Sequence, residues 1–129
     1  MSCMPTPALL QECTRTNDKV FVALNLTLKK KWFDMIESGE KKEEYREPKE
    51  YWKKRLLHYT WGSDTPYLTK EMVMHYDIVI ARNGYAANAP KLVWVNEGLK
   101  LHKPNPNWCE PSDVDKVLFA LQIGKVTRL

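Results

Sequence analysis

The segment SGEKKEEYRE, residues 38–47, marks the place where this chain changes from a helix to a strand. Apolar side chains at helical spacing precede it, and Gly39 stands where a helix ends and the backbone needs a positive φ. Charges of both signs follow the glycine. We interpret residues 42–46 as a short extended segment, in which Glu44 and Arg46 lie two residues apart and share one face.

Apolar patterns on either side of this segment predict the rest of the architecture. The helix before it carries Trp32, Phe33 and Ile36 at helical spacing, and Pro48 stands where a second helix can begin. Alternating or continuous apolar runs predict four further strands, at residues 20–28, 78–81, 92–97 and 117–123. Several strands with short helices inserted after the first one predict an α+β fold, with a small mixed β-barrel or curled sheet.

The length of 129 residues fits a single domain with a core of its own. Residues 1–18 show no periodicity and are predicted to form a flexible N-terminal arm, which leaves residues 19–129 as the domain. Residues 58–75 combine turn residues with few apolar ones, so we expect a long loop or insertion with one short helix there. Gly124 is expected to end the last strand, before a short tail.

The positive charge of the chain is concentrated around the opening segment. The formal net charge is +4, and residues 29–55 contain ten Lys or Arg against seven Asp or Glu, which leaves +3 in that stretch. The sequence pI is about 8.9. A mildly basic protein of this kind is compatible with a polyanionic partner.

Composition also argues against several classes of protein. The three cysteines are odd in number and lack C-x-x-C spacing, and the three histidines lack ligand spacing. We therefore expect reduced thiols, no metal site and no cofactor. The sequence contains neither an apolar run of about 20 residues, the length that spans a bilayer, nor a signal peptide. We expect a cytoplasmic protein without a membrane partner.

The charged residues of the opening segment suit the binding of a phosphate or a nucleobase. Lys41 stands at the mouth of the turn after Gly39, and Arg46 offers a planar fork where lysine offers a point charge. A carboxylate between two cations, here Glu44, favours its charged form and can accept a hydrogen bond from a base or from water. The alternative is a surface Glu–Arg pair that contributes little to stability.

The spacing of Gly39, Lys41, Glu44 and Arg46 reads G-x-K-x-x-E-x-R and resembles the signature of the ASCH family, a branch of the PUA-like β-barrels. The resemblance extends over roughly residues 20–125. Within that family, the chain is similar to the small single-domain prokaryotic or phage type. It also rests on the flanking segments Leu26-Thr27-Leu28-Lys29, Trp32-Phe33-Asp34-Met35-Ile36, Tyr51-Trp52-Lys53-Lys54-Arg55-Leu56, Arg82-Asn83-Gly84-Tyr85 and Ala89-Pro90.

This resemblance implies a PUA-like mixed β-barrel that binds RNA or a nucleotide or nucleoside in a cleft lined by Lys41, Glu44 and Arg46. Four residues outside the motif are further candidates for ligand contacts. Donors to a phosphate or a base edge are expected from Arg82 and Asn83, and stacking surfaces from Tyr85 and Trp108. Each has a structural alternative, because asparagine also caps turns and aromatic rings also pack in cores.

Some members of the family that this chain resembles are small amidohydrolases acting on N4-acetylcytidine, and others are metal-dependent ribonucleases. The enzymatic alternative assigns catalysis to Lys41 and Glu44, with Lys41 activating the nucleophile or a water and Glu44 as the general base. Glu44 stands where the amidohydrolases carry threonine, so the hydroxyl nucleophile of that reaction is missing. A third alternative is a protein that uses its surface for a protein partner.

Overall fold

The computed structural model describes residues 13–16, 19–58 and 68–129. Two compact units make up this part of the chain. The first unit comprises the described residues up to Lys42, together with His75–Asn96 and Ile123–Leu129. The second unit comprises the described residues of Glu43–Met74 and Glu97–Gln122.

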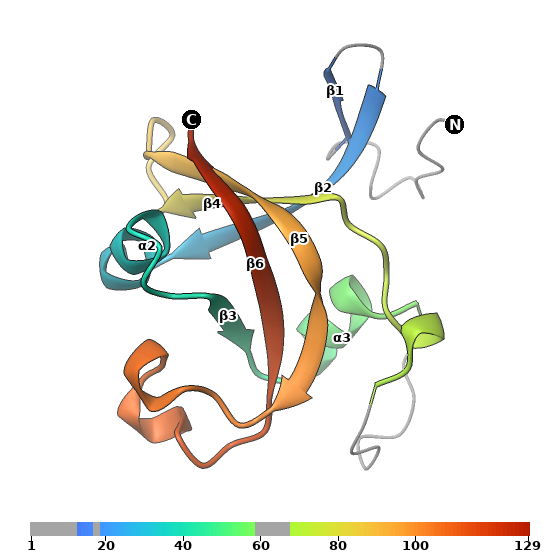
Figure 1. The fold of residues 1–129 in the computed structure, drawn as a ribbon, viewed down its shortest axis with the longest axis vertical. Helices are drawn as coiled ribbons and strands as arrows, with labels where there is room; N and C mark the ends of the chain where they lie inside the picture. The colour runs from blue at the N-terminus through green and yellow to red at the C-terminus, as the bar shows by residue number, and fades with distance from the viewer. Residues whose placement is uncertain (1–12, 17–18, 59–67) are drawn as a thin grey trace. The chain divides into compact units, whose positions relative to one another are not determined.

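The chain folds as a mixed sheet with two α-helices and three 3₁₀ turns among the described residues (Figure 1). In chain order the elements are β1 (Cys13–Thr16), β2 (Lys19–Leu28), α2 (Lys30–Glu37), β3 (Glu43–Arg46), α3 (Glu50–Leu56), η1 (Lys70–Met72), β4 (Ile78–Asn83), β5 (Lys91–His102), η2 (Pro106–Trp108), η3 (Pro111–Asp113) and β6 (Leu118–Arg128). The strand order is β1-β2-β4-β5-β6-β3, and β2 and β4 run parallel. The predicted α+β class and the mixed sheet are confirmed.

In the first unit, alternation along β2, β4 and β5 separates a core face from an outer face. One row of paired residues, Leu24, Val79 and Trp94, points into the core, and so does the next such row, Leu26, Ala81 and Leu92. Helix α2 contacts β4 and buries the apolar side chains that the sequence placed on one face, Trp32, Phe33 and Ile36. The parallel pair needs a crossover connection, and α2 begins it.

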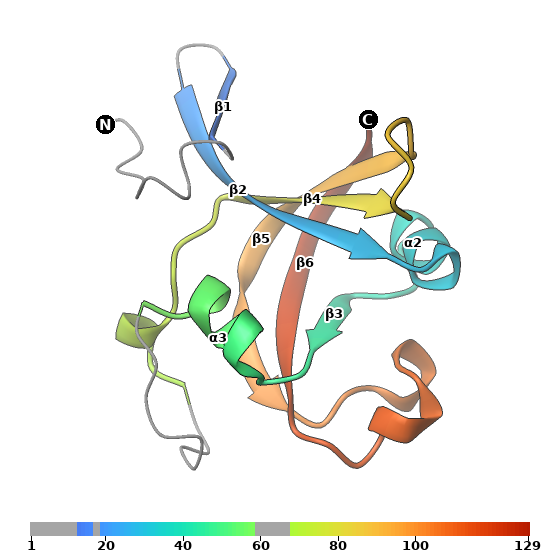
Figure 2. The same ribbon diagram turned by 180° about the vertical axis from the view of Figure 1, so that it is seen from behind.

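In the second unit, β3 pairs antiparallel with β6, and Tyr45 lies opposite Ala120. Both residues belong to a buried cluster with Cys109 and Leu118. Helix α3 follows β3 along the chain (Figure 2). It buries Leu56. The predicted short helix in residues 58–75 is present as η1, whereas residues 59–67 of that loop lie outside the described residues.

Three elements differ from the sequence prediction. Residues 13–16, assigned to the flexible arm, form β1 and pair with β2, while residues 1–12 and 17–18 of that arm lie outside the described residues. Strand β5 extends to His102, and β6 continues past Gly124 to Arg128. Backbone pairing sustains such strands whatever the side-chain pattern, because every residue carries the same donor and acceptor.

The end of α2 is confirmed at the predicted glycine. Gly39 has φ +87°, and its amide donates to the carbonyl of Ile36 over 3.1 Å. The amide of Lys41 then donates to the carbonyl of Met35 over 3.0 Å, so the turn satisfies carbonyls that the helix end leaves exposed. The positive φ is what allows the chain to fold back on the helix at this point.

Replacing Gly39 by alanine tests this requirement. A Cβ at position 39 would come no nearer than 3.9 Å to another side chain, so the cost is conformational and not steric. We expect Gly39→Ala to lower the free energy of unfolding by about 1–2 kcal/mol, measured by urea denaturation. The exposed neighbouring position provides the control, Glu40→Ala, which should change stability much less. A Gly39→Ala variant as stable as the parent would contradict the left-handed turn.

Candidate functional site

Lys41 is held against α2 by its backbone and by its ammonium group. Its Nζ lies 4.8 Å from the centroid of the Trp32 ring, and Nζ of Lys31 lies 4.6 Å from the same centroid. Only 2% of Lys41 is exposed, which is unusual for a lysine. The helix stop at Gly39 and the indole of Trp32 thus fix the first cation of the motif within the first unit.

Glu44 and Arg46 form the second part of the motif, on β3 in the second unit. Arg46 donates from Nη1 to Oε2 of Glu44 and, over 2.7 Å, to the carbonyl of Tyr45. Its guanidinium carbon lies 5.0 Å from the centroid of the Trp52 ring, and Glu44 is only 4% exposed. The prediction that the two charged side chains share a face is confirmed. The contacts restrict the guanidinium to one orientation, which is how a recognition site is preorganised.

Helix α3 carries aromatic and cationic side chains next to this pair. Tyr51 is 56% exposed, and the guanidinium carbon of Arg55 lies 3.9 Å from its ring centroid. Trp52 meets Tyr51 edge to face, with centroids 4.9 Å apart. The last turn of α3 contains three basic residues, Lys53, Lys54 and Arg55. Their positive charges interact favourably with the negative end of the helix dipole, and they can also attract an anionic partner.

A polar network around Glu43 was not foreseen from the sequence. The Tyr45 hydroxyl donates to Oε1 of Glu43 over 2.6 Å and accepts from the amide of Asn105 over 3.0 Å. Gln122 donates from Nε2 to Oε2 of Glu43 over 2.6 Å, and Nε2 of His102 lies 3.1 Å from the same oxygen. The spacing of Glu43 and Tyr45 could have indicated part of this network, but nothing local indicates partners 59 and 79 residues away.

His102 contacts two oxygen atoms through its two ring nitrogens. Nδ1 lies 2.6 Å from the carbonyl oxygen of Lys103, while Nε2 faces the Glu43 carboxylate. The imidazole thus links the Glu43 carboxylate to the backbone at Lys103.

The network shifts two pKa values. Burial alone would raise the pKa of Glu43, but hydrogen bonds from Tyr45 and Gln122 and the charge of His102 together outweigh it, so the pKa lies below its usual 4.5. Burial and the hydrogen bond to Glu43 raise the pKa of Tyr45 far above its ordinary value. Glu43 is therefore ionised and Tyr45 neutral at neutral pH.

The remaining predicted ligand residues lie on several elements. Arg82, on β4, donates from Nη2 to the carbonyl of Ala86 over 2.6 Å, and the amide of Asn83 donates to the carbonyl of Pro90 over 2.9 Å. Tyr85 follows β4 and is 89% exposed, whereas Trp108 is partly buried against the cluster around Tyr45 in the second unit. The structure thus brings Glu44 and Arg46 together and places Trp108 in core packing.

Two absences concern only the described ranges, 13–16, 19–58 and 68–129. Within them, no group of three or more His, Cys, Asp or Glu side chains could hold a metal ion. In the same ranges, no helix combines the length and the apolar character needed to cross a membrane.

Comparisons with known proteins found no match to this chain. No family model matches the chain, and neither a curated protein nor a solved structure does. The ASCH resemblance therefore stays a prediction that rests on the motif and its flanking segments.

The lowered pKa of Glu43 predicts how the unfolding free energy depends on pH. Because the pKa of Glu43 is lower in the folded than in the unfolded protein, the ionised carboxylate stabilises the fold. This contribution is fully present above the pKa of the unfolded protein, near 4.5, and is lost as the pH falls through the folded-state pKa. The difference in unfolding free energy between the parent and Glu43→Gln should thus be largest above about pH 5 and shrink below about pH 4.5. Urea denaturation at pH 7, 5, 4 and 3.5 measures it.

Glu97→Gln is the matched control, because Glu97 is an exposed carboxylate. Its difference from the parent should stay nearly constant over the same pH series. A constant difference for Glu43→Gln as well would show that the network does not stabilise the ionised carboxylate.

Proposed function

We propose that this protein is an ASCH-type, PUA-like domain that binds single-stranded RNA or a nucleotide, with β3 and α3 of the second unit at the binding site. The observation that carries the proposal is the arrangement around Arg46. Its guanidinium is held by Glu44 and lies over the ring of Trp52, and Trp52 in turn contacts the exposed ring of Tyr51 edge to face. Such a combination of fixed cations and aromatic planes is typical of single-strand recognition.

Each side chain has a distinct role in this proposal. Tyr51 and the guanidinium of Arg55 offer flat surfaces on which a base can stack. Arg46 supplies a positive charge, and Glu44 is a positioning residue that keeps its guanidinium in place. The basic last turn of α3 attracts the phosphate backbone.

Several sequence-based assignments stay predictions beside this proposal. The contribution of Lys41, three residues before Glu44 in the motif, is one of them. The contacts expected from Arg82, Asn83, Tyr85 and Trp108 are others. The enzymatic alternative, with Lys41 and Glu44 as catalytic residues, is tested with the same RNA samples.

Tyr51→Ala tests the stacking surface. Because Tyr51 is exposed, the variant should fold normally, and circular dichroism checks this. Losing one stacked base should weaken binding of a mixed-sequence RNA of about ten nucleotides by about 1–3 kcal/mol. Fluorescence anisotropy at low salt measures the affinity, and free nucleosides and nucleotides are titrated in parallel.

Arg55→Gln tests the electrostatic contribution of α3 to RNA binding. The plot of log affinity against log salt should become shallower by about 0.7, the value for one phosphate contact of a single strand. Lys125→Gln, which removes one exposed cation from the first unit, is the control and should leave the slope unchanged.

Two results would contradict the proposal. One is the absence of binding to every RNA and nucleotide at low salt. The other is binding that Tyr51→Ala, Arg55→Gln and Arg46→Gln all leave unchanged, which would place the site elsewhere. Cleavage of the RNA with divalent metal, or release of acetate from N4-acetylcytidine, would favour the enzymatic alternative if Lys41→Ala and Glu44→Ala abolish it.

A further inference from the structure

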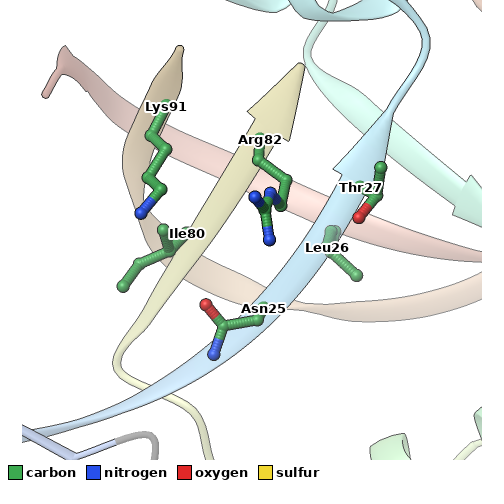
Figure 3. A pocket seen from close by; sticks show the side chains of 6 residues that line it. All are labelled: Asn25, Leu26, Thr27, Ile80, Arg82 and Lys91. Atoms are coloured by element: carbon green, nitrogen blue, oxygen red, sulfur yellow. The ribbon is translucent and has the colours of Figure 1, made fainter. Parts of the chain in front are cut away.

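A small hollow lined by both polar and apolar residues lies on the outer face of the sheet in the first unit. It has a volume of about 210 Å³ and is lined by residues of β2, β4 and β5, namely Asn25, Leu26, Thr27, Ile80, Arg82 and Lys91 (Figure 3). Drug-sized ligands occupy pockets of about 300–1,000 Å³. The smaller volume here fits one compact group of a ligand.

The strand registers place three polar side chains of this hollow in one row. Thr27 on β2 pairs with Arg82 on β4, and Arg82 pairs in turn with Lys91 on β5. Directly paired residues point to the same face, with neighbouring strands about 4.8 Å apart. In Figure 3 the charged ends of Arg82 and Lys91 lean toward the neighbouring row, which contains Asn25 and Ile80.

This row brings two positive charges directly opposite each other. Like charges at paired positions of a sheet are destabilising. Within the described ranges, neither Arg82 nor Lys91 forms an ion pair with a carboxylate. No carboxylate of the described residues therefore pairs with either cation of this row.

Three carboxylates among the described residues of the first unit have other partners. Asp34 pairs with Lys30, and Glu37 pairs with Arg128. Asp77 accepts from the amide of Val22 and contacts His75. An anion from outside the protein would offset the charge of the two cations.

The guanidinium of Arg82 is held in one direction by a hydrogen bond, but its hydrogen-bonding capacity is only partly used. Its Nη2 donates to the carbonyl of Ala86 over 2.6 Å, which fixes its direction. Its Nε is buried and has no hydrogen-bond partner among the described residues. An unsatisfied buried donor costs free energy and is rare in folded proteins.

We propose that Arg82, Lys91, Thr27 and Asn25 form a phosphate-binding site. Arg82 provides the planar fork and Lys91 the point charge that phosphate sites commonly combine, and the polar side chains of Thr27 and Asn25 line the same hollow. The phosphate belongs to a free monoester or to the phosphodiester backbone of RNA. The site is independent of the proposed RNA site in the second unit, since it shares no residue with it.

Lys91→Gln is the test variant, because Lys91 is exposed and its loss leaves the orientation of Arg82 intact. Without an anion, removing the repulsion should raise the urea midpoint. With inorganic phosphate at constant ionic strength, the parent should gain stability and the variant should gain much less. Lys125→Gln, an exposed cation of the same unit, should respond to phosphate as the parent does.

Binding is followed in the Tyr51→Ala background through the backbone amide resonances of Thr27, Arg82 and Lys91, which separates this site from the proposed RNA site. Inorganic phosphate, a nucleoside 5′-monophosphate and a short RNA without terminal phosphates are titrated separately. Saturable shifts that Lys91→Gln weakens about tenfold or more, the value of one charge-assisted hydrogen bond, support the site. Shifts with the RNA identify a phosphodiester, and shifts with the monoesters alone identify a free phosphate group.

The proposal is overturned if chloride produces the same shifts as phosphate, if no shift saturates, or if Lys91→Gln binds phosphate as tightly as the parent. A result of this kind leaves the RNA site intact, because that site is judged by Tyr51 and Arg55.

Discussion

The parallel pairing of β2 with β4 is the constraint on which the first unit depends. It sets segments more than 50 residues apart in a fixed register, with Leu24 opposite Val79 and Thr27 opposite Arg82. One face of the pair becomes the core that α2 covers, and the other becomes the polar row that continues to Lys91. A shift of one residue would exchange the two faces, so the same register determines both the core and the polar row of Thr27, Arg82 and Lys91.

Residues 39–46, which contain the motif, connect helix α2 to strand β3 and reverse the direction of the chain. The positive φ of Gly39 ends α2 and turns the chain back, which brings Lys41 against Trp32. Two residues after Lys41, β3 begins, and its alternation sends Glu44 and Arg46 to one face. Glu43 instead joins Tyr45 in a hydrogen-bonded network. Lys41, Glu43 and Glu44 therefore have different surroundings, because the backbone geometry changes between the turn and the strand.

The two proposed sites use different chemistry. On β3 and α3, planar groups dominate, and Arg46, Trp52, Tyr51 and Arg55 form contacts that suit a base and its adjoining phosphate. On the outer face of the first unit, two cations and short polar side chains line a small hollow that suits a single phosphate. A protein with both would recognise a nucleotide or an RNA strand through its bases at one place and its charge at the other.

The sequence by itself determined the local structure: five of the six strands among the described residues, both helices, the end of α2 at Gly39 and the shared face of Glu44 and Arg46. These follow from periodicity and from the conformational freedom of glycine, which are properties of neighbouring residues. Only the tertiary structure decided that His102 and Gln122 reach Glu43, that Lys91 lies opposite Arg82, and that β1 joins the sheet. Backbone donors and acceptors are alike in every residue, so strand partners and register come from burial and chain connection, which local patterns do not contain.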